Sequence, residues 1–177
     1  MRYLFIVLLT STTLFSANLT FSSGSVQAKT SILGDSNINP SSSNIISHLT
    51  MEKGDVTTLK GTIDVSLVDL KSDNSDRDEH MHKVIDINTY TKTTFTINSV
   101  AKNTEGSYNI YGTLNLHGVS KELNLLGEIT ETSNQVNIKA TTTFNMSDFG
   151  IEPPTLFFLT VRDQLNMTVD TTYTIEP

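Results

Sequence analysis

Two histidines and three acidic residues gather between residues 76 and 82, and residues of these types can bind a divalent metal. The five are His80, His82, Asp76, Asp78 and Glu79. Histidines two positions apart point to the same side only in a strand, and the chain has no His-Glu-x-x-His motif. We therefore interpret this cluster as solvated loop residues and predict no metal ligands.

The residues for nucleophilic catalysis are also poorly placed. The chain has no cysteine and no Gly-x-Ser-x-Gly motif, and its serines lie mainly in polar stretches and turns. His117 precedes Gly118, which is typical of a turn residue rather than a general base. We predict no catalytic residue, no cofactor and no enzymatic activity. A hydrolase would instead need His80 or His117 for turnover.

The elements that hold these residues alternate between apolar and polar positions. Segments 57–67, 95–97, 108–116, 123–129, 136–144 and 165–175 all have a period of two, which is typical of strands with one solvated face. Tight turns join the consecutive strands, so the pattern predicts an antiparallel meander. Closing it into a barrel of about seven or eight strands removes its exposed edges. Apart from these strands we expect only short helices.

A pair of glycines singles out the hairpin over residues 108–129. If its loop covers residues 118–121, Leu116 faces Leu123 and Gly112 faces Gly127 on the apolar side. Two facing glycines indicate a sharp bend or a space kept free of side chains. We take the second interpretation, a barrel with something inside.

Composition predicts one exported domain. An apolar run after Arg2 and a small-x-small pattern ending at Ala28 resemble a signal peptide over residues 1–28. Residues 29–44 are rich in turn formers and are expected to form a flexible N-terminal arm, which leaves the barrel domain at residues 45–177. Export without cysteine fits the bacterial periplasm, or secretion, after cleavage near Ala28.

The net charge and the apolar runs of the chain argue against nucleic-acid binding and against a membrane span. The net charge of −7 argues against nucleic acid. No second apolar run reaches the roughly 18 residues of a membrane span, so no transmembrane segment is expected after signal removal. The sequence leaves the oligomeric state open, a homodimer included.

Three segments in order carry a resemblance to a known family. They are Asp76-Arg77-Asp78-Glu79-His80-Met81, the hairpin stretch Gly112-Thr113-Leu114-Asn115-Leu116-His117-Gly118-Val119-Ser120-Lys121, and Ser147-Asp148-Phe149-Gly150-Ile151. Together they resemble the YceI-like family over residues 57–173. The resemblance implies a lipocalin-like antiparallel β-barrel that binds an isoprenoid or other long-chain lipid in an internal tunnel, without general catalysis. The chain departs from the family pattern in having no clear version of the first strands.

Because a lipid in such a tunnel would contact inward-facing side chains, these are the candidate ligand-binding residues. They are Ile63, Val65, Phe95, Ile97, Tyr108, Ile110, Gly112, Leu114, Leu125, Gly127, Ile138, Phe144, Phe149, Phe157, Met167 and Val169. Phe149 and Phe157 flank Pro153-Pro154 and could form either a portal or a plug at one barrel end.

Two further expectations stay open at this stage. Arg77 is expected to pin its segment through a charge-assisted hydrogen bond to Asp76 or Asp78. The alternative to a lipid carrier is a secreted β-barrel with a filled core that binds a protein or a glycan through its Thr- and Asn-rich outer faces, because eight strands suffice for either a filled or a hollow barrel.

Overall fold

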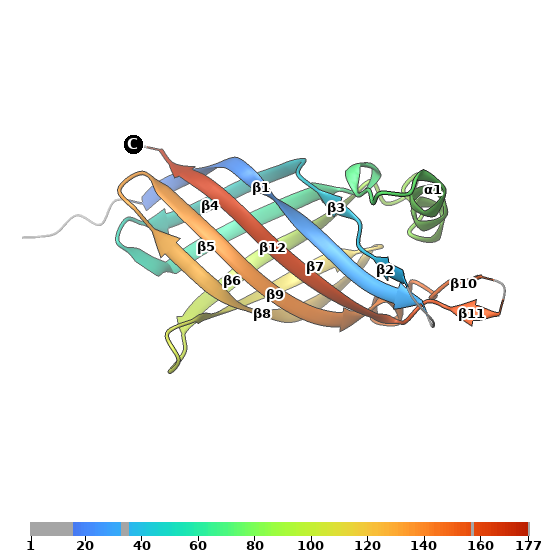
Figure 1. Cartoon of the computed structure of the whole chain (residues 1–177). Coiled ribbons are helices and arrows are strands. Elements are labelled where there is room, and N and C mark those ends of the chain that lie inside the picture. The colour runs from blue at the N-terminus through green and yellow to red at the C-terminus, as the bar shows by residue number, and fades with distance from the viewer. Residues whose placement is uncertain (1–15, 33–35, 157, 177) are drawn as a thin grey trace, which may run out of the picture.

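Eight antiparallel strands close into a barrel in the computed structural model, which describes residues 16–32, 36–156 and 158–176 (Figure 1). Around the barrel each strand pairs with its neighbour, and β12 pairs back with β1. The strands are β1 (Ser16–Ile32), β4 (Ile45–Glu52), β5 (Asp55–Ser66), β6 (Lys92–Lys102), β7 (Tyr108–Leu116), β8 (Val119–Glu131), β9 (Gln135–Asn145) and β12 (Gln164–Ile175). The predicted antiparallel barrel is therefore confirmed.

The short elements gather at one end of the barrel. Helix α1 (Ser75–Val84) and the hairpin of β10 (Thr155–Leu156) and β11 (Leu159–Thr160) lie at the end where β1 finishes, whereas the C-terminus lies at the opposite end (Figure 1). The remaining elements are β2 (Ser36–Ile38), β3 (Ser41–Ser42) and the 3₁₀ helices η1 (Leu67–Asp69) and η2 (Met146–Phe149). We call the end with α1 the mouth and the other the far end.

The central hairpin has a different register from the predicted one. Its loop is only His117 and Gly118, both with positive φ, so Leu116 pairs with Val119. Two left-handed residues in a two-residue turn match the twist of the adjoining strands. Gly127 consequently lies opposite Tyr108, and the predicted Gly112–Gly127 pair is wrong.

Neither glycine leaves an empty space. A Cβ atom added to Gly112 would lie 2.3 Å from Cζ of Phe95, and one added to Gly127 would lie 2.1 Å from the carbonyl oxygen of Lys139. Gly112 thus makes room for an aromatic ring, and Gly127 lets the backbones of β8 and β9 approach closely. The expected gap between the glycines is filled by the protein itself.

Strand β1 overturns the expected domain boundaries. Residues 29–44 are not an arm, because most of their described part lies in β1, β2 and β3. Residues 16–28 belong to the barrel as well, pairing with β12 and β4. Cleavage near Ala28 would cut this strand, so the barrel domain begins before residue 45 and the supposed missing first strand is β1.

A bulge explains why β1 does not look like a strand in the sequence. Its register with β12 shifts between Phe21 and Ser23. Before the shift Leu19 is buried within the core, whereas beyond it the even positions Ala28 and Thr30 face the interior. An extra residue reverses which face each later side chain points to, so apolar residues stop alternating with a single phase.

The far half of the barrel is filled by its own side chains. Leu49, Leu59, Val136 and Tyr173 are no more than 1% exposed. The hydroxyl of Tyr173 is buried without a hydrogen-bond partner, and burial raises the pKa of this tyrosine, although the nearby Thr171 hydroxyl offsets part of that effect. The far end is therefore a packed core rather than a passage.

The two possible starts of the barrel are separated by truncation. A chain that begins at Ser16 should show a cooperative unfolding transition by circular dichroism, because it keeps all of β1. One that begins at Lys29 loses the pairs of β1 with β4 and all but one of its pairs with β12, and should have no such transition. Equal stability of the two chains would contradict the role of β1.

Tight backbone approach at Gly127 predicts a large effect of a single methyl group. Gly127→Ala should lower the free energy of unfolding by at least about 2 kcal/mol, because backbone cannot rotate away as a side chain does. Gly106→Ala is the control, since a Cβ atom at this position meets nothing within 4 Å. The control should lower the free energy of unfolding by only about 1 kcal/mol, because of the left-handed φ of Gly106. Urea denaturation gives both values, and a neutral Gly127→Ala would refute the close approach.

Candidate functional site

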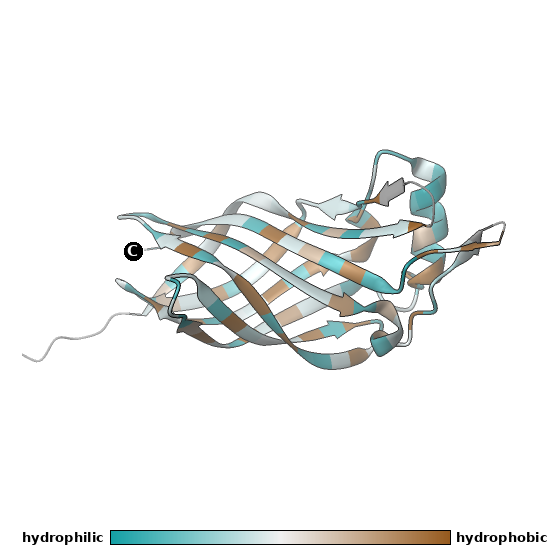
Figure 2. Cartoon of the chain, turned by 60° about the horizontal axis from the view of Figure 1, so that its bottom comes forward, coloured by the Kyte–Doolittle hydropathy of each residue, from teal (hydrophilic) through white to brown (hydrophobic). Residues whose placement is uncertain are grey.

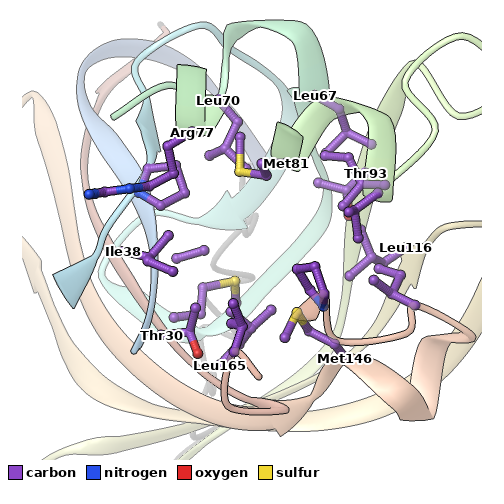
Figure 3. A pocket seen from close by; sticks show the side chains of 18 of the residues that line it. Thr30, Ile38, Leu67, Leu70, Arg77, Met81, Thr93, Leu116, Met146 and Leu165 are labelled. Atoms are coloured by element: carbon purple, nitrogen blue, oxygen red, sulfur yellow. The ribbon is translucent and has the colours of Figure 1, made fainter. Parts of the chain in front are cut away.

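The mouth half of the barrel contains an apolar cavity of about 580 Å³. Side chains from both halves of the chain surround it: Thr30, Ile38, Leu67, Leu70, Met81, Thr93, Leu116, Met146 and Leu165 form much of its ring (Figure 3). Figure 2 shows hydrophobic residues interspersed with hydrophilic ones along the strands. A hollow of this size and lining is typical of small-molecule sites.

Helix α1 covers one side of the mouth, and local sequence dictates where it forms. The side chain of Asn74 caps it by accepting a hydrogen bond of 2.9 Å from the backbone N–H of Arg77. Acidic residues occupy its first turn and basic residues its last, as the helix dipole favours. Lys83 Nζ lies 2.6 Å from Glu79 Oε1, and this hydrogen bond lowers the pKa of Glu79.

Two side chains of α1 tie it to the loop that precedes it. The buried carboxylate of Asp78 accepts hydrogen bonds from the backbone N–H and the hydroxyl of Ser72, at 2.7 to 3.0 Å. His82 Nε2 lies 2.9 Å from the carbonyl oxygen of Leu70. Because charge-assisted bonds to a buried carboxylate are among the stronger ones, these contacts fix α1 over the mouth.

One face of α1 lines the cavity at helical spacing. Arg77, Met81, Val84 and Ile85 line it together with His80. The long axis of the Arg77 side chain runs away from the centre of the opening (Figure 3). The expected contact of Arg77 with Asp76 or Asp78 is not the one that forms, since its recorded ion pair is with Asp73 at 3.9 Å. The polar groups of α1 thus lie at the rim of an apolar interior.

The opposite side of the mouth is built from β1 and the segment between β9 and β12. Thr30 is buried, and its hydroxyl lies 2.9 Å from the carbonyl oxygen of Arg162. Ser147 donates through its backbone N–H and its hydroxyl to the Asp163 carboxylate, at 2.8 and 2.5 Å. These bonds join η2 to the start of β12 and hold the connection against the rim.

A second, narrow space of about 50 Å³ continues the cavity toward the far end. Val26, Val65, Thr93, Leu114 and Met167 line both spaces. Below this shared ring the narrow space is bounded by Phe95, Ile97 and other strand residues. The hollow therefore tapers and ends within the barrel, at the edge of the packed far half.

The structure brings most of the predicted ligand-binding residues to these two spaces. Val65, Leu114, Phe144 and Met167 line the large cavity. The narrow space is lined by Val65, Leu114 and Met167 again and by Ile63, Phe95, Ile97, Ile110, Leu125, Ile138 and Val169. Their period-two alternation places them on the inward faces of the strands, and inward-facing strand positions line whatever the barrel encloses.

Four predicted residues lie elsewhere. Gly112 and Gly127 are packed against other residues as described above, and Tyr108 lies near the far end, where the Lys102 ammonium is 5.9 Å from its ring centroid. Phe149 is fully buried and packs edge-on against Phe144, with ring centroids 5.2 Å apart. Phe149, the last residue of η2, is thus part of the packed core rather than of a portal.

The aromatic connection divides into a buried and an exposed part. Phe157 lies outside the described residues, so its predicted role stays a prediction. Phe158, beside it, is 99% exposed at the end of the β10–β11 hairpin. The plug and portal interpretations were alternatives for one set of residues, and the buried Phe149 decides only its own part of the connection.

Sequence reasoning missed the lining supplied by β1 and by α1. Val26, Ala28 and Thr30 were assigned to a signal peptide and an arm, and the β1 bulge hides their shared face. Met81 and Val84 were not proposed, although their spacing with Arg77 is the i, i+4, i+7 pattern of one helical face. That spacing is the signal that could have found them.

The fold and the site together define a closed β-barrel with an apolar, one-ended internal cavity. The YceI-like domain model matches residues 13–173, and the chain belongs to this family. A UPF0312 protein of Pseudomonas putida strain W619 is 28% identical over 137 residues, which are 73% of this chain and 71% of that protein. None of the helices within the described ranges is long and apolar enough to cross a membrane.

Solved structures share the architecture. The Burkholderia cenocepacia protein BcnA matches with a TM-score of 0.74 at 11% identity, over 84% of this chain and 95% of its own. A Campylobacter jejuni YceI protein matches with a TM-score of 0.71 at 19% identity, over 82% and 89%. A polyisoprenoid binding domain from Saccharophagus degradans matches with a TM-score of 0.66 at 10% identity, over 93% and 100%. At these identities the likeness concerns the fold.

The anchoring of α1 predicts a local response to mutation. Asp78→Ala leaves the N–H and hydroxyl of Ser72 without their acceptor, so opening of α1 should become easier by about 1 to 3 kcal/mol. Hydrogen exchange should be faster in α1 while the barrel strands keep their protection. Asp73→Ala, at a residue whose side chain is 90% exposed, is the control and should change little. Uniform loss of protection throughout the barrel would contradict a local anchor.

Proposed function

We propose that this protein binds one elongated isoprenoid-type or other long-chain lipid in the mouth cavity and carries or stores it without catalysis. The observation that carries the proposal is the 580 Å³ cavity with its almost wholly apolar wall, at one end of a closed barrel. Each buried methylene group contributes about 0.8 kcal/mol, so even a partly enclosed chain gains several kcal/mol.

The comparisons support the chemical class of the ligand. The chain belongs to the YceI-like family, and one protein of the same fold is a polyisoprenoid binding domain. The wall of the cavity offers little for acid-base or nucleophilic chemistry, because its titratable residues Asp76, Arg77 and His80 gather on α1 at the rim, whereas the interior is lined by apolar residues and by the hydroxyl groups of Thr30 and Thr93. This arrangement favours binding over turnover. The hollow mouth half likewise favours a carrier over the alternative of an interaction module with a filled core.

We also propose that the protein works outside the cytoplasm, in the periplasm. The motivation is the apolar N-terminal run after Arg2 and a chain without cysteine. Because β1 is a barrel strand, we expect any signal cleavage to occur before it rather than near Ala28. The intact mass of protein recovered from the cell envelope would identify the first residue, and a mature chain beginning near Lys29 would contradict this site.

Lipid uptake is the direct test. Protein recovered from the envelope, analysed by native mass spectrometry and by organic extraction, should release a long-chain lipid at about one molecule per chain. Leu116→Arg should reduce this yield at least about tenfold, because an unpaired charge would enter the apolar cavity. Leu126→Arg, on the exposed outer face of β8, is the matched control. Equal lipid content in the two variants would refute the proposal. So would the absence of lipid both from the protein recovered from the envelope and from protein incubated with prenols.

A further inference from the structure

The point at which the hollow ends sets the length of the lipid chain that the barrel can enclose. The large cavity of 580 Å³ narrows through the shared ring of Val26, Val65, Thr93, Leu114 and Met167 into a space of only 50 Å³. Beyond that space the interior is occupied by Leu49, Leu59, Val136 and Tyr173, none more than 1% exposed. The barrel is therefore about half hollow, and a bound chain cannot pass through it.

Phe95 is the largest side chain at this boundary, and its position is fixed from three sides. It is 8% exposed, and it lies in register between Ile63 on β5 and Leu114 on β7. Its ring lies over Gly112, where any Cβ atom would come within 2.3 Å of Cζ. A glycine at position 112 thus leaves room for the end of the aromatic ring beside β7, directly below the shared ring of the cavity.

From this geometry we infer that Phe95, seated on Gly112, is the floor of the ligand site and limits the enclosed chain to about twenty carbon atoms. At about 30 Å³ per non-hydrogen atom, the share of liquid volume that one water molecule occupies, the 580 Å³ cavity holds on the order of twenty carbons, or four isoprene units. The inference rests on the proposed function and specifies the length of its ligand. Carbon atoms beyond this number stay outside the mouth.

A series of prenols with 10, 15, 20, 25 and 30 carbon atoms tests the limit in the full-length wild-type protein. Affinity, measured by competition in native mass spectrometry, should rise at least about tenfold per added isoprene unit up to 20 carbons, since each unit buries five more carbon atoms. From 20 to 30 carbons it should rise less than about threefold in total. A continued tenfold gain per unit through 30 carbons would overturn the floor while leaving lipid binding intact.

Phe95→Ala tests the residue itself. The substitution removes six carbon atoms and widens the narrow space that continues the cavity, which makes room for about one more isoprene unit. The variant should therefore bind the 25-carbon prenol at least about tenfold more tightly than the 20-carbon one. Leu59→Ala is the matched control, because it removes a buried apolar side chain that lines neither space, and its length preference should equal that of the wild type.

The outcomes separate this inference from the function on which it rests. Phe95→Leu, a smaller change, replaces Phe95→Ala if the latter does not fold, and it should shift the preference in the same direction. An unchanged length preference in a folded Phe95 variant, or an equal shift in Leu59→Ala, would show that Phe95 is not the floor. Failure of every prenol to bind the wild type would instead refute the proposed function and this inference with it.

Discussion

The pairing of β1 with β12 is the interaction on which the rest of the structure depends. It joins the first and last strands through ten residue pairs and turns an open sheet into a barrel, so that the eight barrel strands, as far as the structure describes them, leave no long edge for other chains to pair with. The cavity exists only because of this closure: β1 supplies Val26, Ala28 and Thr30 to its wall. An extended strand of seventeen residues is long enough to reach from the filled far end to the mouth.

Barrel closure alone does not decide whether the interior is hollow. At eight strands the space inside can be filled by side chains or can hold a small ligand, and this protein does both along one axis. At the far end large side chains such as Tyr173 and Leu49 are fully buried. At the mouth the wall encloses the cavity and includes small residues such as Ala28 and Thr93, and α1 covers one side of the opening. Packing therefore divides the barrel into a filled far half and a hollow mouth half.

Much of this could be predicted from alternation, and the failures have physical causes. The assumed loop after Leu116 shifted the hairpin register by four positions, yet an even shift keeps every side chain on the same face, so the inward set survived while the Gly112–Gly127 pair did not. Strand β1 was lost because its bulge changes the inward positions from odd to even within one strand. The helical spacing of Arg77, Met81 and Val84 indicates the face of α1 that lines the cavity, but the position of α1 over the mouth could not be predicted, since the contacts of Asp78 and His82 that fix it are with a loop without periodicity.

A tube closed at one end gives its contents a direction. If a lipid occupies this barrel, its tail lies in the apolar interior and its polar group stays beside Arg77 and His80 at the rim, because burying the polar group inside would cost free energy. The packed far half leaves the mouth as the way in. The same opening then serves for loading and unloading. Any membrane or protein that gives or receives the molecule must face α1 and the β10–β11 hairpin, so handover is confined to one pole of the protein while the outer wall of the barrel takes no part.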